Sequence, residues 1–283
     1  MGIFFRQLWG ELVRLFARKR TYIGFIAFLG LEATLVWFFH RPKPQEWIQK
    51  MGENAGGELL GDVFSALTLG FLVLGFSVFL LGGIYIALVS GDIVAKEAED
   101  GTLRMVLSRP ASRLRVLVLK WASCWIYTVA LVAFIGATSL GVGVILRGTG
   151  GMFLVIAPEA KFLQLYDWDE GLVKYAMAVG MLSLSMGVMA SVGFLFSCFK
   201  VKPAAASILA LTVLFADFVM GKMPPLEAYR PYFLTTKMDA WVEILRDPVP
   251  VATLVMEYGI LAGVCVTCFV VGAVVFQLRD FKT

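Results

Sequence analysis

Six long apolar stretches, each nearly free of charged residues, constrain the fold of this chain more than any other feature of its sequence. The hydrocarbon core of a bilayer is about 30 Å thick, and a helix needs about 20 apolar residues to cross it. A single segment in lipid satisfies its own backbone hydrogen bonds only as a helix. We therefore predict an all-α polytopic membrane protein without strands. It has one transmembrane domain over residues 1–283 and six transmembrane helices, at residues 21–39, 63–89, 121–146, 175–199, 203–221 and 251–277.

Composition and charge exclude a soluble domain and orient the helices. Hydrophobic residues make up 59% of the chain and charged residues only 16%, which is far from the average of soluble domains. With the N-terminus in the cytoplasm, the cytoplasmic segments have a net charge of +9 and the outer segments a net charge of −2. This asymmetry follows the positive-inside rule and places both termini in the cytoplasm. The overall charge of +4 requires no nucleic acid as a partner.

The segments that flank the stretches have their own patterns. Residues 1–20 place Leu8 and Leu12 on one helical face and Arg14 away from it, which predicts an interfacial amphipathic helix that lies on the membrane, contacts a partner protein, or does both. Residues 147–174 are expected to skim the interface. Residues 222–250 contain five prolines with aromatic residues between them, which predicts broken or re-entrant helices on the outer side.

The long cytoplasmic loop between the second and third stretches has an ordered series of helix signals. Asp92 can cap a short helix that ends at Gly101, where glycine tolerates the left-handed conformation. Thr102 can start a second helix, which Pro110 ends. Ser112 can cap the third transmembrane helix. The pattern predicts a rigid helix, elbow and helix between two membrane spans, a shape suited to transmitting force from a soluble partner.

These residues resemble the ABC-2 permeases of ATP-binding-cassette exporters. The resemblance rests on Glu97, on Gly101-Thr102-Leu103, on Pro110-Ala111-Ser112-Arg113 and on Lys120. It implies a coupling helix over residues 92–107 that inserts into a separate ATPase subunit. It also implies two ATPase copies, a second permease subunit, and a bacterial cytoplasmic (inner) membrane. ATP and Mg²⁺ are then expected on the ATPase and no cofactor on this chain.

The resemblance also assigns roles to individual residues. Those expected at the ATPase contact are Asp92, Glu97, Glu99, Asp100, Gly101, Thr102 and Leu103. Those expected to form the elbow and the anchor at the membrane surface are Pro110, Ser112, Arg113 and Lys120. A catalytic role for this chain is not expected, because the sequence lacks a GxxxxGK[ST] phosphate loop and any paired nucleophile and base.

Three acidic residues lie within the predicted spans, where charge is costly and often functional. Glu32 and Asp217 either line a polar translocation path or form hydrogen bonds that stabilise packing, whereas Glu257 is expected near the interface. If Glu32 and Asp217 line a path, an alternative function is an ion- or proton-coupled carrier. A membrane scaffold that transports nothing is a further alternative.

A copper-transport site is a weaker alternative. Four methionines on the fourth stretch, with Cys265 and Cys268, could suggest soft-metal ligands. Methionine is common in apolar packing, however, and the only histidine, His40, lies elsewhere. We therefore predict no metal site, and the substrate stays unidentified.

Overall fold

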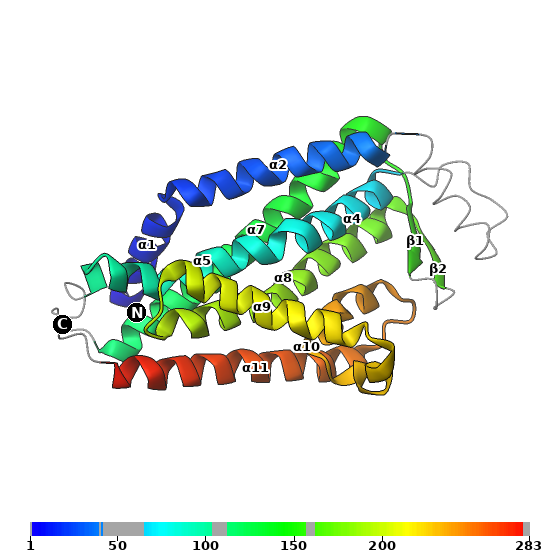
Figure 1. Cartoon of the computed structure of the whole chain (residues 1–283). Coiled ribbons are helices and arrows are strands. Elements are labelled where there is room, and N and C mark those ends of the chain that lie inside the picture. The colour runs from blue at the N-terminus through cyan, green and yellow to red at the C-terminus, as the bar shows by residue number, and fades with distance from the viewer. Residues whose placement is uncertain (1, 40, 42–64, 104–111, 157–161, 280–283) are drawn as a thin grey trace.

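The chain forms a bundle of long helices in the computed structural model, which describes residues 2–39, 41, 65–103, 112–156 and 162–279 (Figure 1). Within these residues, six helical segments are long and apolar enough to cross a membrane, which confirms the six predicted spans. They are Thr21–Phe39 within α2 (Lys19–Phe39), Ala66–Glu99, α7 (Arg113–Arg147), α8 (Trp168–Cys198), α9 (Pro203–Gly221) and α11 (Val251–Leu278). A shorter helix, α1 (Gly2–Phe16), precedes them.

Several of these helices extend beyond the predicted spans. The second span joins α4 (Ala66–Ser77), a π-helical segment η1 (Val78–Gly82) and α5 (Gly83–Glu99), and so continues ten residues past its predicted end. The third, α7, begins eight residues earlier than predicted, because Ser112 accepts a hydrogen bond from the backbone N–H of Arg115 as its N-cap. With 35 residues, α7 is about 52 Å long and reaches well past the hydrocarbon core.

The α8 helix is the centre of the bundle. It packs against α5, α7, α9 and α11, and it is the most buried of the six spans. Small residues allow this close packing. A Cβ atom added at Gly193 of α8 would collide with the Ser90 side chain of α5, and one at Gly187 would collide with Trp125 of α7.

The structure contains an antiparallel β-hairpin, so the prediction that the chain has no strands is wrong. The strands β1 (Met152–Ile156) and β2 (Phe162–Tyr166) pair with Met152 opposite Tyr166 and Ile156 opposite Phe162. Each strand is a mostly apolar run of five residues, too short for a spanning helix. Pairing of the two strands forms the backbone hydrogen bonds that neither run could form alone. Apart from this hairpin, the described chain is helical or in loops.

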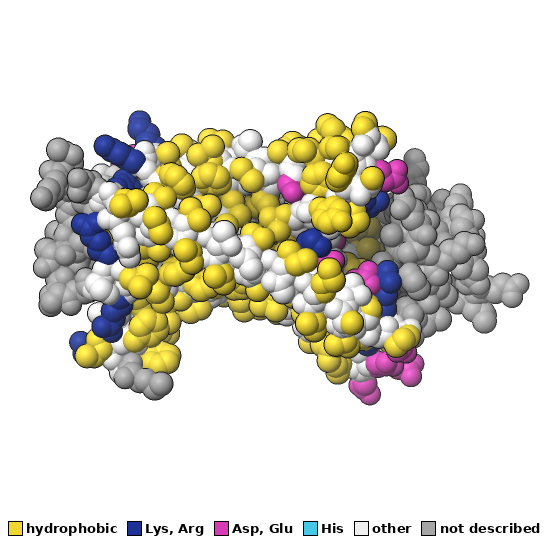
Figure 2. Space-filling model, turned by 90° about the horizontal axis from the view of Figure 1, so that it is seen from below, with side chains coloured by type: hydrophobic (Ala, Val, Ile, Leu, Met, Phe, Trp, Pro, Cys, Tyr) yellow, Lys and Arg dark blue, Asp and Glu magenta, His cyan; other side chains and the backbone are white. Residues whose placement is uncertain are grey.

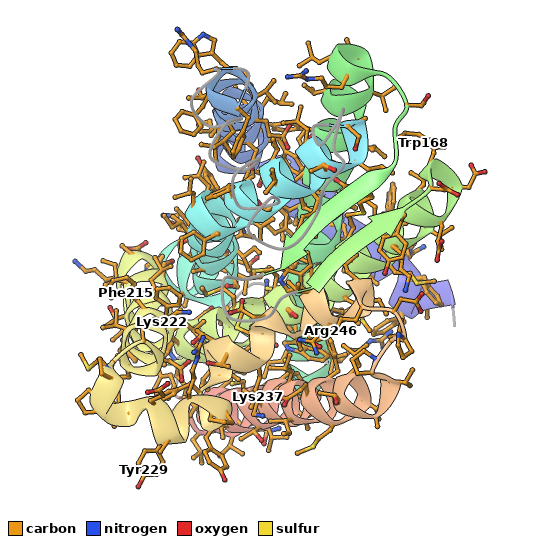
Figure 3. All side chains as sticks on the ribbon, turned by 90° about the vertical axis from the view of Figure 1, so that its right-hand side faces the viewer. Trp168, Phe215, Lys222, Tyr229, Lys237 and Arg246 are labelled. Carbon is orange, nitrogen blue, oxygen red and sulfur yellow. The ribbon has the colours of Figure 1, made fainter. Side chains whose placement is uncertain are left out.

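The segment between α9 and α11 consists of short helices, as its prolines predict. These are the 3₁₀-helix η2 (Pro224–Tyr232), α10 (Leu234–Met238) and the 3₁₀-helix η3 (Asp239–Leu245). Figure 3 looks onto this end of the bundle, with Tyr229 at its rim and Lys237 and Arg246 nearer its middle. Whether the segment enters the membrane stays a prediction.

The two ends of the bundle differ in charge, and we name them by this difference. The basic end holds α1, the end of α5, the start of α7, the turn from α8 to α9 and the end of α11 (Figure 1). The distal end holds the hairpin and the segment from η2 to η3. Figure 2 shows a hydrophobic middle, Lys and Arg with almost no acids at the basic end, and Asp and Glu mixed with Lys and Arg at the distal end.

Candidate functional site

A cluster of buried and partly buried ionic side chains connects three helices at the basic end. The Lys120 ammonium of α7 lies 2.7 Å from a Glu97 carboxylate oxygen of α5 and 3.6 Å from Glu11 of α1. Arg18, between α1 and α2, lies 3.6 Å from the other Glu97 oxygen. Lys120 is 0% exposed and Glu97 is 8% exposed. We call these four residues the ionic cluster.

The ionic cluster changes the roles predicted for two residues. Lys120 lies inside the protein and so does not anchor α7 at the membrane surface, because a buried ammonium needs a charged partner and Glu97 provides it. The Glu97 carboxylate is correspondingly held within the chain, so the structure does not support its predicted contact with an ATPase. Two partners, Glu11 and Arg18, were missed, because the sequence gives no sign that α1 folds back onto α7.

The turn after α5 forms as the sequence predicts. Gly101 has a φ of +72°, in the left-handed region that glycine favours. Its N–H donates to the carbonyl of Ala98, and the N–H of Asp100 donates to that of Lys96. Thr102 and Leu103 then resume a helical conformation, with the Thr102 hydroxyl donating to the Glu97 carbonyl. Leu103 is buried, and Pro110 lies outside the described residues.

Asp92 does not start a helix, which corrects its predicted capping role. The α5 helix runs without a break through Gly91 and Asp92, and both residues are buried. The glycine at position 91 serves close packing rather than a helix end, because a Cβ atom there would meet Ser207 of α9. Residues 92–99 of the predicted coupling helix are therefore the end of the transmembrane helix α5 and not a separate short helix. Its residues 104–107 lie outside the described residues.

A side chain from α8 also enters this part of α5. The Ser197 hydroxyl accepts hydrogen bonds from the backbone N–H groups of Val94, at 2.9 Å, and Ala95, at 3.2 Å. This contact connects the last turns of α5 to the end of α8. Sequence reasoning missed it, because a serine in an apolar helix carries no signal of its partner.

The exposed tip of α5, at Glu99 and Asp100, is acidic. Glu99 and Asp100 are about half exposed, and both contact Lys96, at 3.3 and 3.0 Å. Of the carboxylates predicted to meet an ATPase, these two remain accessible.

Arg113 links the start of α7 to the end of α11. Its guanidinium donates to the carbonyls of Gln277 and Arg279, at 3.1 and 3.2 Å. Ser112 caps α7 as predicted. The basic end is thus connected from α1 through α5 and α7 to α11, while the predicted membrane-surface role of Arg113 stays a prediction.

Asp217 binds the segment from η2 to η3, which favours the packing role over the polar path, the two alternatives given for this residue. Its carboxylate accepts hydrogen bonds from the backbone N–H groups of Leu234 and Thr235 and from the Thr235 hydroxyl, at 2.7 to 3.1 Å. Nearby, Glu257 of α11 pairs with Lys237 at 2.6 Å. These acids fix α10 onto α9 and α11.

Further contacts hold η3 to the rest of the distal end. The Tyr166 hydroxyl donates to the Leu245 carbonyl at 2.6 Å, and burial raises the pKa of this phenol, so it stays a neutral donor. The Lys174 ammonium donates to the carbonyls of Ile244 and Arg246.

Glu32 of α2 lies in the interface with α7 and is 1% exposed. One carboxyl oxygen accepts hydrogen bonds from the Thr138 and Ser139 hydroxyls, each at 3.0 Å. Both hydroxyl groups therefore come from another span. This geometry fits a packing contact between helices, and access to a translocation path stays untested.

The described residues contain no group of three or more His, Cys, Asp or Glu side chains placed to hold a metal ion. Cys265 and Cys268 are both buried within α11.

Comparison with known proteins identifies the family of the chain. A family profile described as "ABC-2 family transporter protein" matches residues 38–281, nearly the whole chain. The chain belongs to the ABC-2 family. This membership confirms the resemblance and makes the chain a membrane protein of a transporter family.

A curated relative matches over a shorter length. The uncharacterized protein YhcI of Bacillus subtilis (strain 168) is 35% identical over 74 residues, which is 25% of this ABC-2 chain and 23% of the relative. Its name gives no substrate or partner.

Proposed function

We propose that this chain is the permease subunit of an ABC exporter and that a separate ATPase binds the tip of α5 at the basic end. The ionic cluster is the observation that most supports this proposal, because it fixes the end of α5 rigidly to the neighbouring helices. Lys120 fixes Glu97 against α7 and, through Glu11, against α1. Movement at the tip of α5 would therefore shift several spans together.

In this proposal the roles of the coupling residues divide in two. Glu99, Asp100 and Thr102 are exposed and contact the ATPase. Glu97 and Lys120 transmit the movement to the membrane helices. ATP and Mg²⁺ belong to the ATPase, which is present in two copies on a dimer of permease subunits. The basic end is cytoplasmic, as the positive-inside rule requires, in a bacterial inner membrane.

The ATPase contact is tested by charge reversal at the tip. The tagged chain is isolated from its source membranes, and any ABC ATPase that accompanies it is identified and quantified by mass spectrometry. We expect the double variant Glu99→Lys with Asp100→Lys to reduce recovery of the ATPase about tenfold or more, because two acid contacts become repulsive. The matched control is Asp169→Lys with Glu170→Lys, two exposed acids at the start of α8 at the distal end. Equal recovery from both double variants would place the ATPase elsewhere.

Transport assays separate this proposal from the carrier. Uptake into inverted vesicles that requires ATP and the ATPase would support the exporter. Uptake driven by a pH gradient without ATP, and abolished by Glu32→Gln, would instead support the carrier.

A further inference from the structure

Helix α1 presents three different faces. Its protein face contains Leu15, which is buried, and Leu8 and Leu12, which are partly buried. Glu11 lies on this face and reaches Lys120 at 3.6 Å. The helix is therefore held in a fixed position against α7, and its other faces are presented as a preformed surface.

A second face of α1 is apolar and exposed. Phe5, Trp9 and Val13 follow one another at four-residue spacing, which places them in one row, and they are 61%, 69% and 51% exposed. Large side chains exposed together mark an interaction site. A tryptophan and a phenylalanine beside a set of membrane spans are typical of a helix that enters the headgroup and acyl boundary.

The edge beside this row is basic. Arg6 and Arg14 are both exposed and lie two turns apart, with Gly10 between them. Arg14 approaches Glu11 at 3.7 Å but stays 61% exposed. Glu11 is the only acid in α1 and points toward Lys120, so positive charge dominates the exposed surface. A guanidinium matches phosphate oxygens in geometry and charge.

We infer that this surface of α1 is a binding site for acidic phospholipids in the leaflet at the basic end. Phe5, Trp9 and Val13 enter the acyl region, while Arg6 and Arg14 bind headgroup phosphates. The complementary charge selects an acidic lipid over a zwitterionic one, since each basic side chain near an acidic membrane favours binding by a factor of about five. This inference rests on the membrane location of the chain and not on its proposed coupling to an ATPase.

Lipid selectivity is tested with the purified chain in nanodiscs of equal parts phosphatidylcholine and phosphatidylglycerol. The lipids that remain bound after transfer to mild detergent are counted by native mass spectrometry. We expect phosphatidylglycerol to be enriched, and Arg6→Gln with Arg14→Gln to reduce the enrichment about tenfold. The control is Lys200→Gln with Lys202→Gln, which removes the same charge from exposed positions of the same end. An unchanged enrichment in the arginine variant, or an equal loss in the control, would overturn the proposal.

The depth of the apolar row is tested by labelling neighbouring positions with a fluorophore. Trp9→Cys and Gly10→Cys differ by one residue but lie about 100° apart around the helix. All four native cysteines are buried, so a thiol reagent is directed to the new site. We expect nitroxide groups on the lipid chains to quench the label at position 9 several-fold more than the label at position 10. Equal quenching at both positions, or none at position 9, would show that water or another protein covers this face.

Discussion

At the scale of single residues, Lys120 is the one on which the basic end most depends. A fully buried ammonium is tolerated only with charged partners, and Lys120 has Glu97 and Glu11. Its loss would leave Glu97 with the more distant Arg18, at 3.6 Å, and Glu11 with Arg14, at 3.7 Å. The same lysine was predicted to lie at the membrane surface, because its position at the start of a span is equally typical of a headgroup contact.

We predict that Lys120→Met destabilises the chain by at most about 3 to 5 kcal/mol, the usual cost of leaving a buried charge without its partner, because Arg18 still faces Glu97. Thermal unfolding in nanodiscs, followed by tryptophan fluorescence, measures the loss. Lys96→Met is the control, since Lys96 pairs with exposed acids on the same α5 helix and its removal should change little. If both variants unfold alike, the burial of Lys120 has no energetic role.

A second prediction concerns Asp217, whose carboxylate accepts three hydrogen bonds from Leu234 and Thr235. Asp217→Ala leaves these donors without an acceptor, at a cost of about 1 to 3 kcal/mol. Amide hydrogen exchange at Leu234 and Thr235 should accelerate by about tenfold or more. Glu227→Ala removes an exposed acid of the nearby helix η2 and should leave the exchange rates of both amides unchanged. Unchanged protection in the Asp217 variant would contradict the role assigned to its carboxylate.

At the scale of elements, the end of α5 depends on one backbone conformation. Gly101 has a positive φ and open space around the position of a Cβ atom. A substitution there is therefore strained by the backbone and not by crowding.

We predict that Gly101→Ala costs about 1 to 2 kcal/mol, whereas Gly101→Asn costs less, because asparagine tolerates the left-handed region better. Both variants are compared by thermal unfolding and by the ATPase rate of the complex with the partner subunit. An alanine variant as stable and as active as the asparagine variant would show that the left-handed turn is not required.

Local signals predicted some elements well and others poorly. Apolar length predicted the six spans, and Gly101 and Ser112 predicted one helix end and one helix start, because each of these depends on neighbouring residues in the chain. Asp92 was misplaced because an acid after a glycine resembles a helix start, whereas here close packing on α9 keeps the helix intact. The hairpin was missed because its two apolar strands become recognisable only when they pair.

Across the whole molecule, the features that the sequence did not predict are contacts between side chains that lie far apart in the chain. The sequence identified Glu97 and Lys120 as candidate functional residues, but it did not predict that they pair. Their ion pair, and the contact of Lys120 with Glu11, form only when three helices pack together. Asp217 and Glu32 could be recognised as unusual, but their hydroxyl and amide partners lie on other elements. The charge asymmetry of the two ends, in contrast, was predicted from the charged residues between the spans, and it agrees with the acids visible at the distal end in Figure 2.

The central claim is that a separate ABC ATPase binds the exposed tip of α5, and cross-linking from single cysteines tests it most directly. Asp100→Cys places a thiol at the tip, and Asp169→Cys places a matched thiol at the distal end, while the native cysteines are buried. With a reagent that carries a thiol-reactive group and a photoactivated group, we expect cross-links to the ATPase from position 100 and none from position 169, with a yield that changes when ATP is added. Cross-links from position 169, or none from position 100 in a complex that hydrolyses ATP, would contradict it.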